Sequence, residues 1–365
     1  MKITSQTEAL HTAFQIVGSV VQPRPTRPIL ATVLLRAADD TLELQATDLE
    51  IGIRFTVPDV QIEEEGAIAV PQARVAGILR ETADETVTLS TDDRHCVITA
   101  SDSVFRLPME SAEEFPDLPR LDQEKAYELD RNELVEMTSK TTFAAHKGKH
   151  RYALNGVLLV ISEKKIEMVA TDGRRLAHIE RKAENPEGTD ESVIVPTKAL
   201  DQLLKVLTDE DERVRVNIAE NQLVAKTLRA TISTRLVEGH FPPYESVIPS
   251  DCDKKLEVRR ESFHSAVRRA ALLTSEESSS VVLHLQEGKV EVTSAAPETG
   301  EARVEVAVDY SGPALEIGFN PEFLTDFFRA VDDETVRMEL RDASSAGILR
   351  AGKDFLYVVM PVSRE

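Results

Sequence analysis

The sequence has no tryptophan, only two cysteines and far fewer basic than acidic residues. Its 365 residues include 43 Lys and Arg against 64 Asp and Glu, a formal net charge of −21 at pH 7. Such a chain repels phosphate at long range, because nucleic-acid affinity comes mainly from Lys and Arg that displace counterions. The composition therefore excludes a diffuse, tight nucleic-acid binder. It leaves room only for weak or topologically assisted binding through basic residues segregated on one surface.

Cysteine and long apolar runs are both scarce. Cys96 and Cys252 lie far apart and form no metal-ligand spacing, which is typical of the reducing cytosol and not of a disulfide scaffold. No apolar run approaches the ~20 residues needed to span a bilayer. The polar start Met1-Lys2-Ile3-Thr4 predicts no secretory leader, so we expect a cytoplasmic protein without a membrane partner.

The sequence does contain one pattern three times. Val33-Leu34-Leu35-Arg36 recurs as Val157-Leu158-Leu159-Val160 and as Val281-Val282-Leu283-His284, and each step is 124 residues. This period is too long for a solenoid unit and fits a whole small domain. We therefore predict three tandem domains over residues 1–122, 123–253 and 254–365.

Each repeat predicts the same order of elements. A helix opens it, and the apolar stripes of these helices are Leu10, Phe14, Val17, Val21; Leu134, Met137, Thr141, Ala145; and Phe263, Val267, Ala270, Leu273. A β-hairpin follows, at 29–36 and 41–46 in the first repeat. A second helix begins after Val70-Pro71, Val195-Pro196 and Phe319-Asn320-Pro321, and alternating strands close the unit. The fold class is α+β, with two helices packed on antiparallel sheets in each domain.

Three similar domains in tandem have a geometric consequence. Edge strands of one unit can pair with the next unit and build a continuous sheet. If every junction turns the chain by the same angle, head-to-tail copies form either a closed ring or an open fibre. In the closed form, two chains share the ring. One chain then covers an arc, and a second chain completes a ring of six-fold pseudo-symmetry.

Short motifs in a fixed order over the whole chain carry a resemblance to a known family. They are Arg24-Pro25-Thr26, Pro28-Ile29-Leu30, Thr47-Asp48-Leu49-Glu50, Arg151-Tyr152, Leu154-Asn155-Gly156-Val157, Ala170-Thr171-Asp172-Gly173-Arg174-Arg175-Leu176-Ala177, Phe241-Pro242 with Tyr244, Ile317-Gly318-Phe319-Asn320 and Tyr357-Val358-Val359-Met360-Pro361. With them the chain resembles the bacterial sliding clamp, the β subunit of DNA polymerase III. The resemblance implies a non-catalytic, head-to-tail homodimeric ring that encircles double-stranded DNA without sequence specificity. It also implies a processivity factor that tethers polymerases, the clamp loader and repair proteins through short peptides, without cofactor or metal.

The resemblance also implies three sets of site residues. The DNA-contacting set is Arg24, Arg74, Lys147, Lys149, Arg151, Tyr152 and Lys198. The peptide pocket is Leu154, Thr171, Gly173, Arg174, Arg175, Leu176, Pro242, Val247, Phe323, Met360, Pro361 and Val362. The dimer seam is Arg74, Phe105, Arg106, Leu272, Leu273, Glu298 and Glu301. Further basic residues that could line the ring are Arg80, Lys140, Lys205, Arg259, Arg260, Arg268, Arg269 and Arg329. The chain departs from the family pattern at Ala73, Ser246, Ser344 and Ser363, and the three serines bear on peptide preference.

Two other functions stay open at this point. A triplicated domain could be an interaction scaffold whose edge strands bind proteins only, and retention on closed circular DNA would discriminate the two. Asp48 and Asp172, which match across repeats, could belong to a hydrolase. The third repeat has Ala296 at this point, however, and no His, Cys or metal cluster accompanies the pair. Carboxylates in this context more often close turns, so we predict turns and no enzyme.

Overall fold

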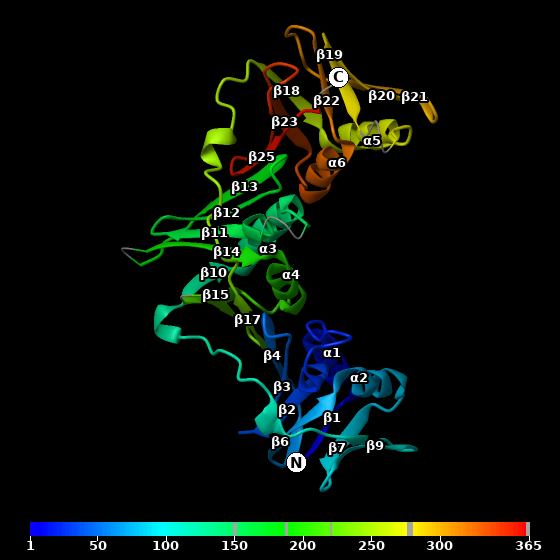
Figure 1. Cartoon of the computed structure of the whole chain (residues 1–365), viewed down its shortest axis with the longest axis vertical. Helices are drawn as coiled ribbons and strands as arrows, with labels where there is room; N and C mark the ends of the chain where they lie inside the picture. Colours follow the sequence, from blue (N-terminus) through cyan, green and yellow to red (C-terminus); the bar gives the residue numbers. More distant parts are fainter. Residues whose placement is uncertain (149–151, 187–188, 220, 276–279, 363–365) are drawn as a thin grey trace. The chain divides into compact units, whose positions relative to one another are not determined.

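The computed structural model describes residues 1–148, 152–186, 189–219, 221–275 and 280–362 (Figure 1). Each repeat contains two α-helices among antiparallel strands. The first repeat consists of β1 (Lys2–Gln6), α1 (Thr7–Gly18), β2 (Thr32–Ala38), β3 (Thr41–Thr47), β4 (Ile51–Val57), β5 (Gln61–Glu64), β6 (Gly66–Pro71), α2 (Gln72–Glu81), β7 (Thr86–Thr91), β8 (His95–Thr99) and β9 (Val104–Pro108).

The second and third repeats follow the same order without a counterpart of β5. The second consists of β10 (Tyr127–Asp130), α3 (Arg131–Thr141), β11 (Gly156–Ser162), β12 (Lys165–Thr171), β13 (Arg175–Lys182), β14 (Asp190–Pro196), α4 (Thr197–Val206), β15 (Arg213–Ala219), β16 (Gln222–Lys226) and β17 (Ala230–Arg235). The third consists of β18 (Lys254–Arg259), α5 (Arg260–Ala271), β19 (Val281–Gln286), β20 (Lys289–Ala296), β21 (Gly300–Ala307), β22 (Leu315–Phe319), α6 (Pro321–Ala330), β23 (Thr335–Leu340), β24 (Gly347–Ala351) and β25 (Phe355–Val359). The predicted α+β class and the triplication are confirmed.

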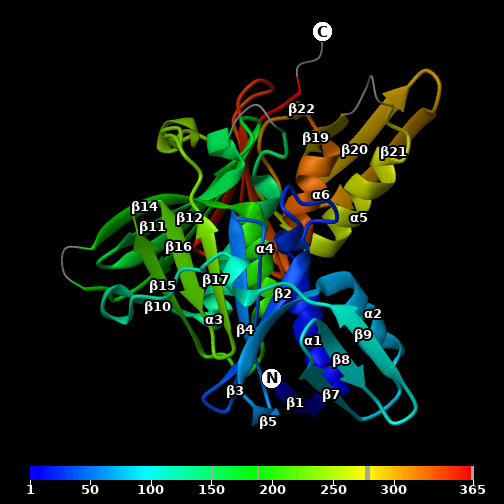
Figure 2. The ribbon, with the colours of Figure 1, turned by 60° about the horizontal axis from the view of Figure 1, so that its bottom comes forward.

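The sheets do not stop where the repeats do. One eight-stranded sheet has the order β10-β15-β16-β17-β4-β3-β2-β6, and a second has the order β14-β11-β12-β13-β25-β24-β23-β18. The first joins repeats one and two through β17 and β4, and the second joins repeats two and three through β25 and β13. A five-stranded sheet (β5-β1-β7-β8-β9) and a four-stranded sheet (β21-β20-β19-β22) complete the fold. Figure 2 shows β17 beside β4, and β7, β8 and β9 as neighbours.

Because the sheets continue across repeats, the chain forms two compact units. One consists of Met1–Asn132 and Lys198–Leu236, the other of Glu133–Thr197 and Val237–Glu365. The second repeat contributes to both units. In the described residues, no helix is long and apolar enough to cross a membrane.

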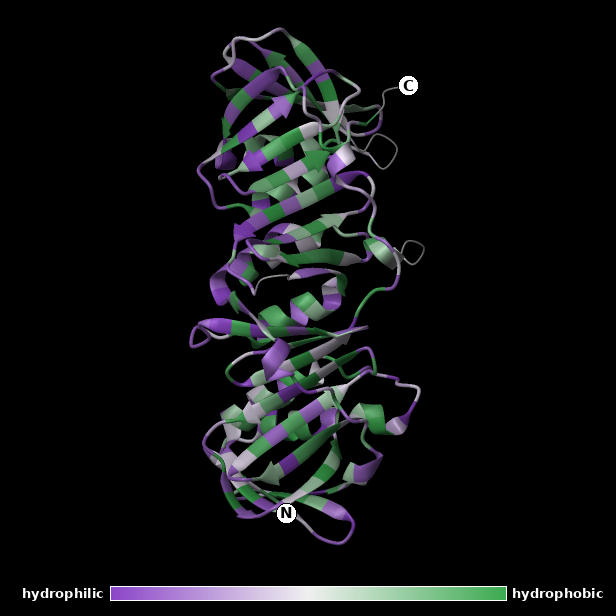
Figure 3. Cartoon of the chain, turned by 90° about the vertical axis from the view of Figure 1, so that its left-hand side faces the viewer, coloured by the Kyte–Doolittle hydropathy of each residue, from purple (hydrophilic) through white to green (hydrophobic). Residues whose placement is uncertain are grey.

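Paired helices cover one face of the sheets in each unit. Helix α1 packs on α2 and on β3 and β4, and α5 packs on α6 and on β20 and β21. The rings of Phe263 and Phe328, one from each helix of the second pair, lie 5.4 Å apart and are fully buried. Hydrophilic and hydrophobic residues alternate along many strands in Figure 3, as expected when only one face of a sheet is buried.

The predicted start of the first hairpin and the predicted extent of the three opening helices were wrong. The first hairpin begins at Thr32 and not at residue 29, because Pro28 fixes the backbone for a 3₁₀ turn, η1 (Pro28–Ala31). The first helices end at Gly18, Thr141 and Ala271, so the last residue of each predicted stripe lies beyond its helix. After α1 and α5 the chain continues in tight i→i−3 turns, which keep a helix-like spacing in the sequence.

Candidate functional site

Large apolar side chains that stay exposed draw attention to the predicted sites. In the described part of the chain they are Leu49, Val104, Phe105, Leu228, Val247, Leu272, Met360 and Val362. Five of these eight belong to the predicted seam or peptide pocket. Large apolar side chains that gather on the surface mark interaction sites, so the predicted seam and the predicted peptide pocket are both candidate interaction surfaces.

The turn between β12 and β13 forms one wall of the predicted pocket. The Asp172 carboxylate accepts hydrogen bonds from the backbone amides of Arg174 (2.9 Å) and Arg175 (3.1 Å). Gly173 has a φ of +88°, a conformation that other residues rarely adopt. The Thr171 hydroxyl donates to the Arg175 carbonyl at 2.6 Å. The turn is therefore rigid, and it exposes Gly173 and Arg174 while Thr171 and Arg175 are buried.

Arg175 connects this turn to α6. Its guanidinium donates to the carboxylates of Asp172 (3.0 Å) and Asp326 (2.8 Å) and to the Phe143 carbonyl (2.8 Å). It lies over the Phe323 ring at 4.5 Å. Burial lowers the pKa of Arg175, but contacts with Tyr357, Asp326 and Asp172 outweigh burial and raise that pKa overall. The side chain is only 5% exposed, so within the predicted pocket Arg175 holds the turn against α6 from the protein interior.

The C-terminal segment forms a second wall. The Met360 amide donates to the Arg174 carbonyl (2.8 Å), and the Val362 amide donates to the Gly318 carbonyl (2.9 Å). These bonds fix the backbone while the Met360 and Val362 side chains remain 46% and 38% exposed. Pro361 between them is partly buried. A fixed backbone with free apolar side chains is a suitable surface for a peptide.

The floor of the pocket is a buried cluster shared by β13, β14 and β25. Leu176, Ile194 and Val358 belong to it, and Phe241 and Tyr244 pack against it while only partly buried. Leu176 is 3% exposed, so it is core, whereas Val247 is 53% exposed. Leu154 and Phe323 are intermediate and Pro242 is exposed. All predicted pocket residues lie in one compact unit. Of the serines that depart from the family pattern, Ser246 and Ser344 are exposed and Ser363 lies outside the described residues.

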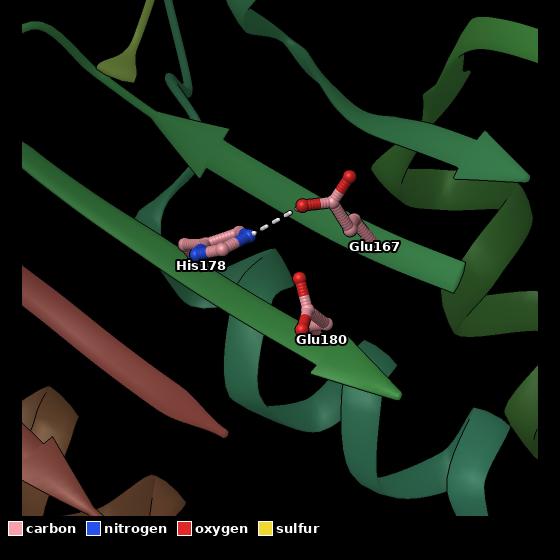
Figure 4. Close-up of side chains that lie close together, drawn as sticks. All are labelled: Glu167, His178 and Glu180. Atoms are coloured by element: carbon pink, nitrogen blue, oxygen red, sulfur yellow. Dashed lines mark hydrogen bonds and ion pairs between the residues drawn. The ribbon is translucent and has the colours of Figure 1, made fainter. Parts of the chain in front are cut away.

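A charged cluster stands beside Tyr244. The His178 imidazole lies 3.2 Å from Glu167, and Glu180 is directly opposite Glu167 on the neighbouring strand (Figure 4). The ligand atoms of these three residues lie within 4.8 Å of one another, but the Lys165 ammonium is 3.0 Å from Glu167 and 3.3 Å from Glu180. A metal ion would have to displace this ammonium, so we assign none. Burial, together with Glu167 and Glu245, raises the pKa of Tyr244 to about 12.

The first predicted seam element is β9, an edge strand. Val104 and Phe105 are 62% and 37% exposed, and Phe105 borders a hollow of about 610 Å³ with Arg74, Gly77 and Ile78. Arg106 pairs with Asp92 at 2.8 Å, so its charge is already neutralised. Arg74 is exposed and has no ion-pair partner among the described residues. The hollow therefore combines the apolar side chains of Ile78, Phe105 and Leu107 with a mixed charged rim, in which Arg74 stands near the carboxylates of Glu81, Asp84 and Asp102.

The second predicted seam element is β21, also an edge strand, with the residues that precede it. Leu272 is 76% exposed just beyond α5, whereas Leu273 is partly buried. The Thr299 hydroxyl donates to the Leu273 carbonyl at 2.8 Å and ties this turn to β21. Glu298 and Glu301 are exposed and lack an ion-pair partner in the described chain. Leu272 is thus an exposed apolar side chain that suits the apolar residues of the hollow at β9, and Glu298 and Glu301 carry the charge opposite to that of Arg74.

The predicted DNA contacts have different surroundings. Arg24 and Lys147 are exposed, while Lys149, Arg151 and the Tyr152 side chain lie outside what the structure describes. Lys198 is half exposed and donates to the Asp48 carboxylate at 2.7 Å. Lys140, a further candidate, is buried against Glu136 (2.6 Å) and over the Phe355 ring, so it is no surface cation.

The sequence prediction missed His264 on α5. Burial and the neighbouring Arg268, Arg329 and Arg260 lower its pKa. Residues 260, 264 and 268 follow one helical face, and Arg329 of α6 joins them. The three arginines were already among the candidate ring-lining residues, and the i, i+4, i+8 spacing could have added His264 to them from the sequence.

Comparison with known families decides the relationship. Three family profiles match in succession: residues 1–119 match the N-terminal domain of the DNA polymerase III beta subunit, 128–243 its central domain and 245–363 its C-terminal domain. The chain belongs to the DNA polymerase III beta subunit family. The predicted resemblance is confirmed.

Relatives in this beta subunit family match over the full length. A beta sliding clamp of Pseudomonas putida is 35% identical over 99% of this chain and 100% of its own, and that of Escherichia coli K12 is also 35% identical with the same coverage. The crystal structure of a DNA polymerase sliding clamp from Bacillus subtilis superposes with a TM-score of 0.96 at 27% identity, and covers 100% of both chains. A Pseudomonas aeruginosa clamp bound to griselimycin gives a TM-score of 0.94 at 32% identity, also with 100% coverage of both.

The beta subunit family is that of sliding clamps, which are non-catalytic processivity factors. The two aspartates considered for catalysis have structural roles here. The Asp48 carboxylate accepts hydrogen bonds from the backbone amides of Glu50 and Ile51, two and three residues after it. The Asp172 carboxylate accepts the equivalent bonds from the amides of Arg174 and Arg175. Burial raises the pKa of Asp48, but hydrogen bonds from Lys198 and Ile51 outweigh it and lower that pKa overall. Both carboxylates close turns, as predicted.

Proposed function

We propose that two copies of this chain form a head-to-tail ring that encircles double-stranded DNA without sequence specificity. The ring is the processivity clamp of the replicative DNA polymerase III in the cytoplasm. It tethers polymerase subunits, the clamp loader and repair proteins through short peptides. Its three domains are residues 1–122, 123–253 and 254–365. One observation carries the proposal: a full-length match to sliding clamps in a chain whose strands β9 and β21, the two kinds of strand that pair at the internal junctions, are both sheet edges.

The strand order itself supports a head-to-tail seam. At both internal junctions the last strand of one repeat pairs with the third hairpin strand of another: β17 with β4, and β25 with β13. The members left over are β9 and β21, and both are edges. Pairing β9 of one protomer with β21 of its partner repeats the rule a third time. A contact of this kind closes a ring after two chains if each junction turns equally.

The same rule gives a register. Arg54 pairs with Thr231 and His178 with Leu356, and residues 54, 178 and 302 are each 124 apart. Val104 holds the same position in its hairpin as Thr231. Val104 pairs with Thr99, the last residue of β8, and Thr231 pairs with Lys226, the last residue of β16. Val104 is therefore expected opposite Ala302 of a second protomer, and Phe105 opposite Glu301.

This register can be tested by disulfide trapping. Val104→Cys with Ala302→Cys is expected to give a covalent dimer on mild oxidation, because opposed residues have Cβ atoms about 4.5–5.5 Å apart. Cys252 is replaced by serine. Cys96 stays, because burial raises its thiol pKa to about 11 and keeps it unreactive near pH 8. Non-reducing electrophoresis reports the product.

The matched control shifts the register by one residue. Val104→Cys with Glu301→Cys puts the two thiols on opposite faces of the sheet and is expected to give little dimer. Equal cross-linking of both pairs, or none in either, would contradict the proposed seam.

For DNA, we propose sliding contacts from Arg24, Lys147, Lys149, Arg151, Tyr152 and Lys198. Arg74 fits the seam better than the DNA set, because it borders the hollow beside Phe105. The basic face of Arg260, His264, Arg268 and Arg329 extends the DNA-contacting set. Weak contacts are sufficient, since a closed ring holds DNA by topology while the net charge of −21 opposes adhesion.

For peptides, we propose the pocket formed by Leu154, Gly173, Arg174, Pro242, Val247, Phe323, Met360, Pro361 and Val362, held from behind by Thr171, Arg175 and Leu176. Met360→Ser with Val362→Ser is expected to weaken binding of a fluorescein-labelled polymerase-subunit peptide at least about tenfold, because central apolar contacts carry most interface energy. Fluorescence anisotropy measures the dissociation constant. The backbone bonds of both residues survive, so the fold is kept.

Leu49→Ser is the control, since Leu49 is exposed to a similar degree (42%) and belongs to no proposed site. It is expected to leave peptide affinity unchanged. If the double variant binds the peptide as tightly as the parent, the proposed pocket is wrong, even if the ring is correct.

The alternative is a scaffold that binds proteins only, and the free edges β9 and β21 are compatible with it. An experiment with the cross-linked dimer distinguishes the DNA-encircling ring from the protein-binding scaffold. A ring closed around circular duplex DNA is expected to remain bound in high salt and to be released when a restriction enzyme linearises the circle. A scaffold would show neither effect.

A further inference from the structure

A pocket whose charged lining residues are mainly basic lies where the first and second repeats share a sheet. This pocket of about 360 Å³ is lined by Arg54 of β4, Arg120 of the chain between repeats, and Lys226 and Arg229 at the end of β16 and the following turn. Glu43 is the carboxylate in this lining. The lining therefore has four positive side chains and one negative one, although the whole chain has a net charge of −21.

Part of this positive charge is uncompensated. Arg54 pairs with Glu43 at 3.1 Å, and Arg229 pairs with Glu210, outside the lining, at 2.8 Å. Arg120 and Lys226 are exposed and have no ion-pair partner among the described residues. With Glu210 included, two positive charges remain at the mouth of the pocket. These two side chains can approach a carboxylate without first breaking an internal ion pair.

The pocket also has an apolar rim on a fixed turn. Leu228 is 64% exposed between β16 and β17, although Thr227 and Ala230 beside it are buried. The buried Asp211 carboxylate accepts the Leu228 amide at 2.7 Å and the Thr208 amide at 2.8 Å, and the Ala230 amide donates to the Thr227 hydroxyl at 3.0 Å. The turn thus holds an exposed leucine beside two free cations.

The pocket faces away from the helix layer. On β4, Ile51, Ile53 and Phe55 are buried, and α1 packs against this strand. Successive side chains alternate between the faces of a strand, so Arg54 points to the opposite face, where it donates to the Leu118 carbonyl at 3.3 Å. The cations of this pocket therefore do not belong to the helix face proposed for DNA.

We propose that this pocket binds an acidic segment of a partner protein, whose carboxylates contact Arg120 and Lys226 and whose apolar residue covers Leu228. Charge complementarity selects such a partner, because the strongly acidic remainder of the chain repels it. The exposed leucine favours a peptide over a bare anion, which has no apolar group to place there.

The test is anisotropy titration of the full-length dimer with a labelled twelve-residue peptide of alternating glutamate and leucine. Arg120→Glu with Lys226→Glu is expected to weaken binding at least about tenfold, and Leu228→Ser a few-fold. Lys255→Glu with Lys353→Glu, two exposed lysines of the other compact unit, makes the same change in net charge and is expected to leave affinity within about twofold.

Three results would overturn the proposal: no binding by the parent chain, equal losses in both charge-reversed variants, or an unchanged affinity in Leu228→Ser. Tripolyphosphate, added as a competitor of the labelled peptide, gives a further test. If it displaces the peptide and Leu228→Ser has no effect, the pocket is a phosphate site and the peptide assignment is wrong. Peptide binding at the C-terminal pocket, measured in the same variants, should not change, so failure here leaves the clamp function intact.

Discussion

Leu272→Asp is expected to raise the dissociation constant of the dimer about 100-fold. The side chain is 76% exposed in the single chain, so the substitution removes little from the fold of its own protomer. In the proposed seam it enters the hollow at Phe105, where a buried carboxylate would meet apolar side chains. Hot-spot residues cost about 2–4 kcal/mol when lost, and 1.4 kcal/mol corresponds to a factor of ten. Sedimentation equilibrium over a range of protein concentrations measures the change.

Leu49→Asp serves as the matched control for this experiment. Leu49 is also an exposed leucine, and aspartate tolerates its φ of +75° better than most residues. This variant is expected to dimerise like the parent. If Leu272→Asp also retains the parent dissociation constant, the β21 end of the molecule is not part of the seam, and the ring proposal loses its main contact.

Arg175→Met is expected to lower the free energy of unfolding by about 3–5 kcal/mol. Removal of the guanidinium leaves Asp172 and Asp326 close together and 15% and 14% exposed, without their shared cation. Removing one partner of a buried ion pair costs this much. Asp172 then keeps only the backbone amides of its turn, and Asp326 keeps only the largely exposed Arg329 at 3.4 Å. The Phe143 carbonyl also loses its donor. Urea titration followed by circular dichroism measures the effect.

Arg174→Met is the control, because this neighbour is exposed and its change should lie within about 0.5 kcal/mol of the parent. Addition of Asp172→Asn and Asp326→Asn to Arg175→Met should recover part of the loss, since the two carboxylates that faced Arg175 become neutral while the turn keeps its acceptor. A loss of similar size in Arg174→Met, or none in Arg175→Met, would show that the buried ion-pair network does not stabilise this unit.

For the proposed peptide pocket, the sequence predicted a set of residues that lie in one compact unit, but it could not tell which of them are exposed. The motif around Thr171 and Leu176 is easy to find in sequence. Only burial distinguishes Gly173 and Arg174, which face solvent, from Arg175 and Leu176, which support the wall from behind. The exposure of Met360 and Val362 likewise depends on the hydrogen bonds that hold their backbones to Arg174 and Gly318.

The surroundings of individual charged residues likewise could not be predicted from the sequence. Lys140 and Lys198 look like solvated helix lysines in the sequence, yet Lys140 is buried over the ring of Phe355 and Lys198 donates to Asp48, 150 residues away. Pairings between residues distant in sequence have no local signature. The pocket around Arg120 and Lys226 escaped prediction for this reason, because β4, the chain between repeats and the turn after β16 meet only in the folded unit.

The sequence by itself determined the triplicated α+β architecture and the family, because apolar periodicity, proline signals and the 124-residue spacing are local properties that repeat. The tertiary structure decided which strands join the repeats, which edges remain free and which predicted site residues reach solvent. These depend on sheet register and long-range packing, which bring together residues whose separation in sequence carries no information about their contact.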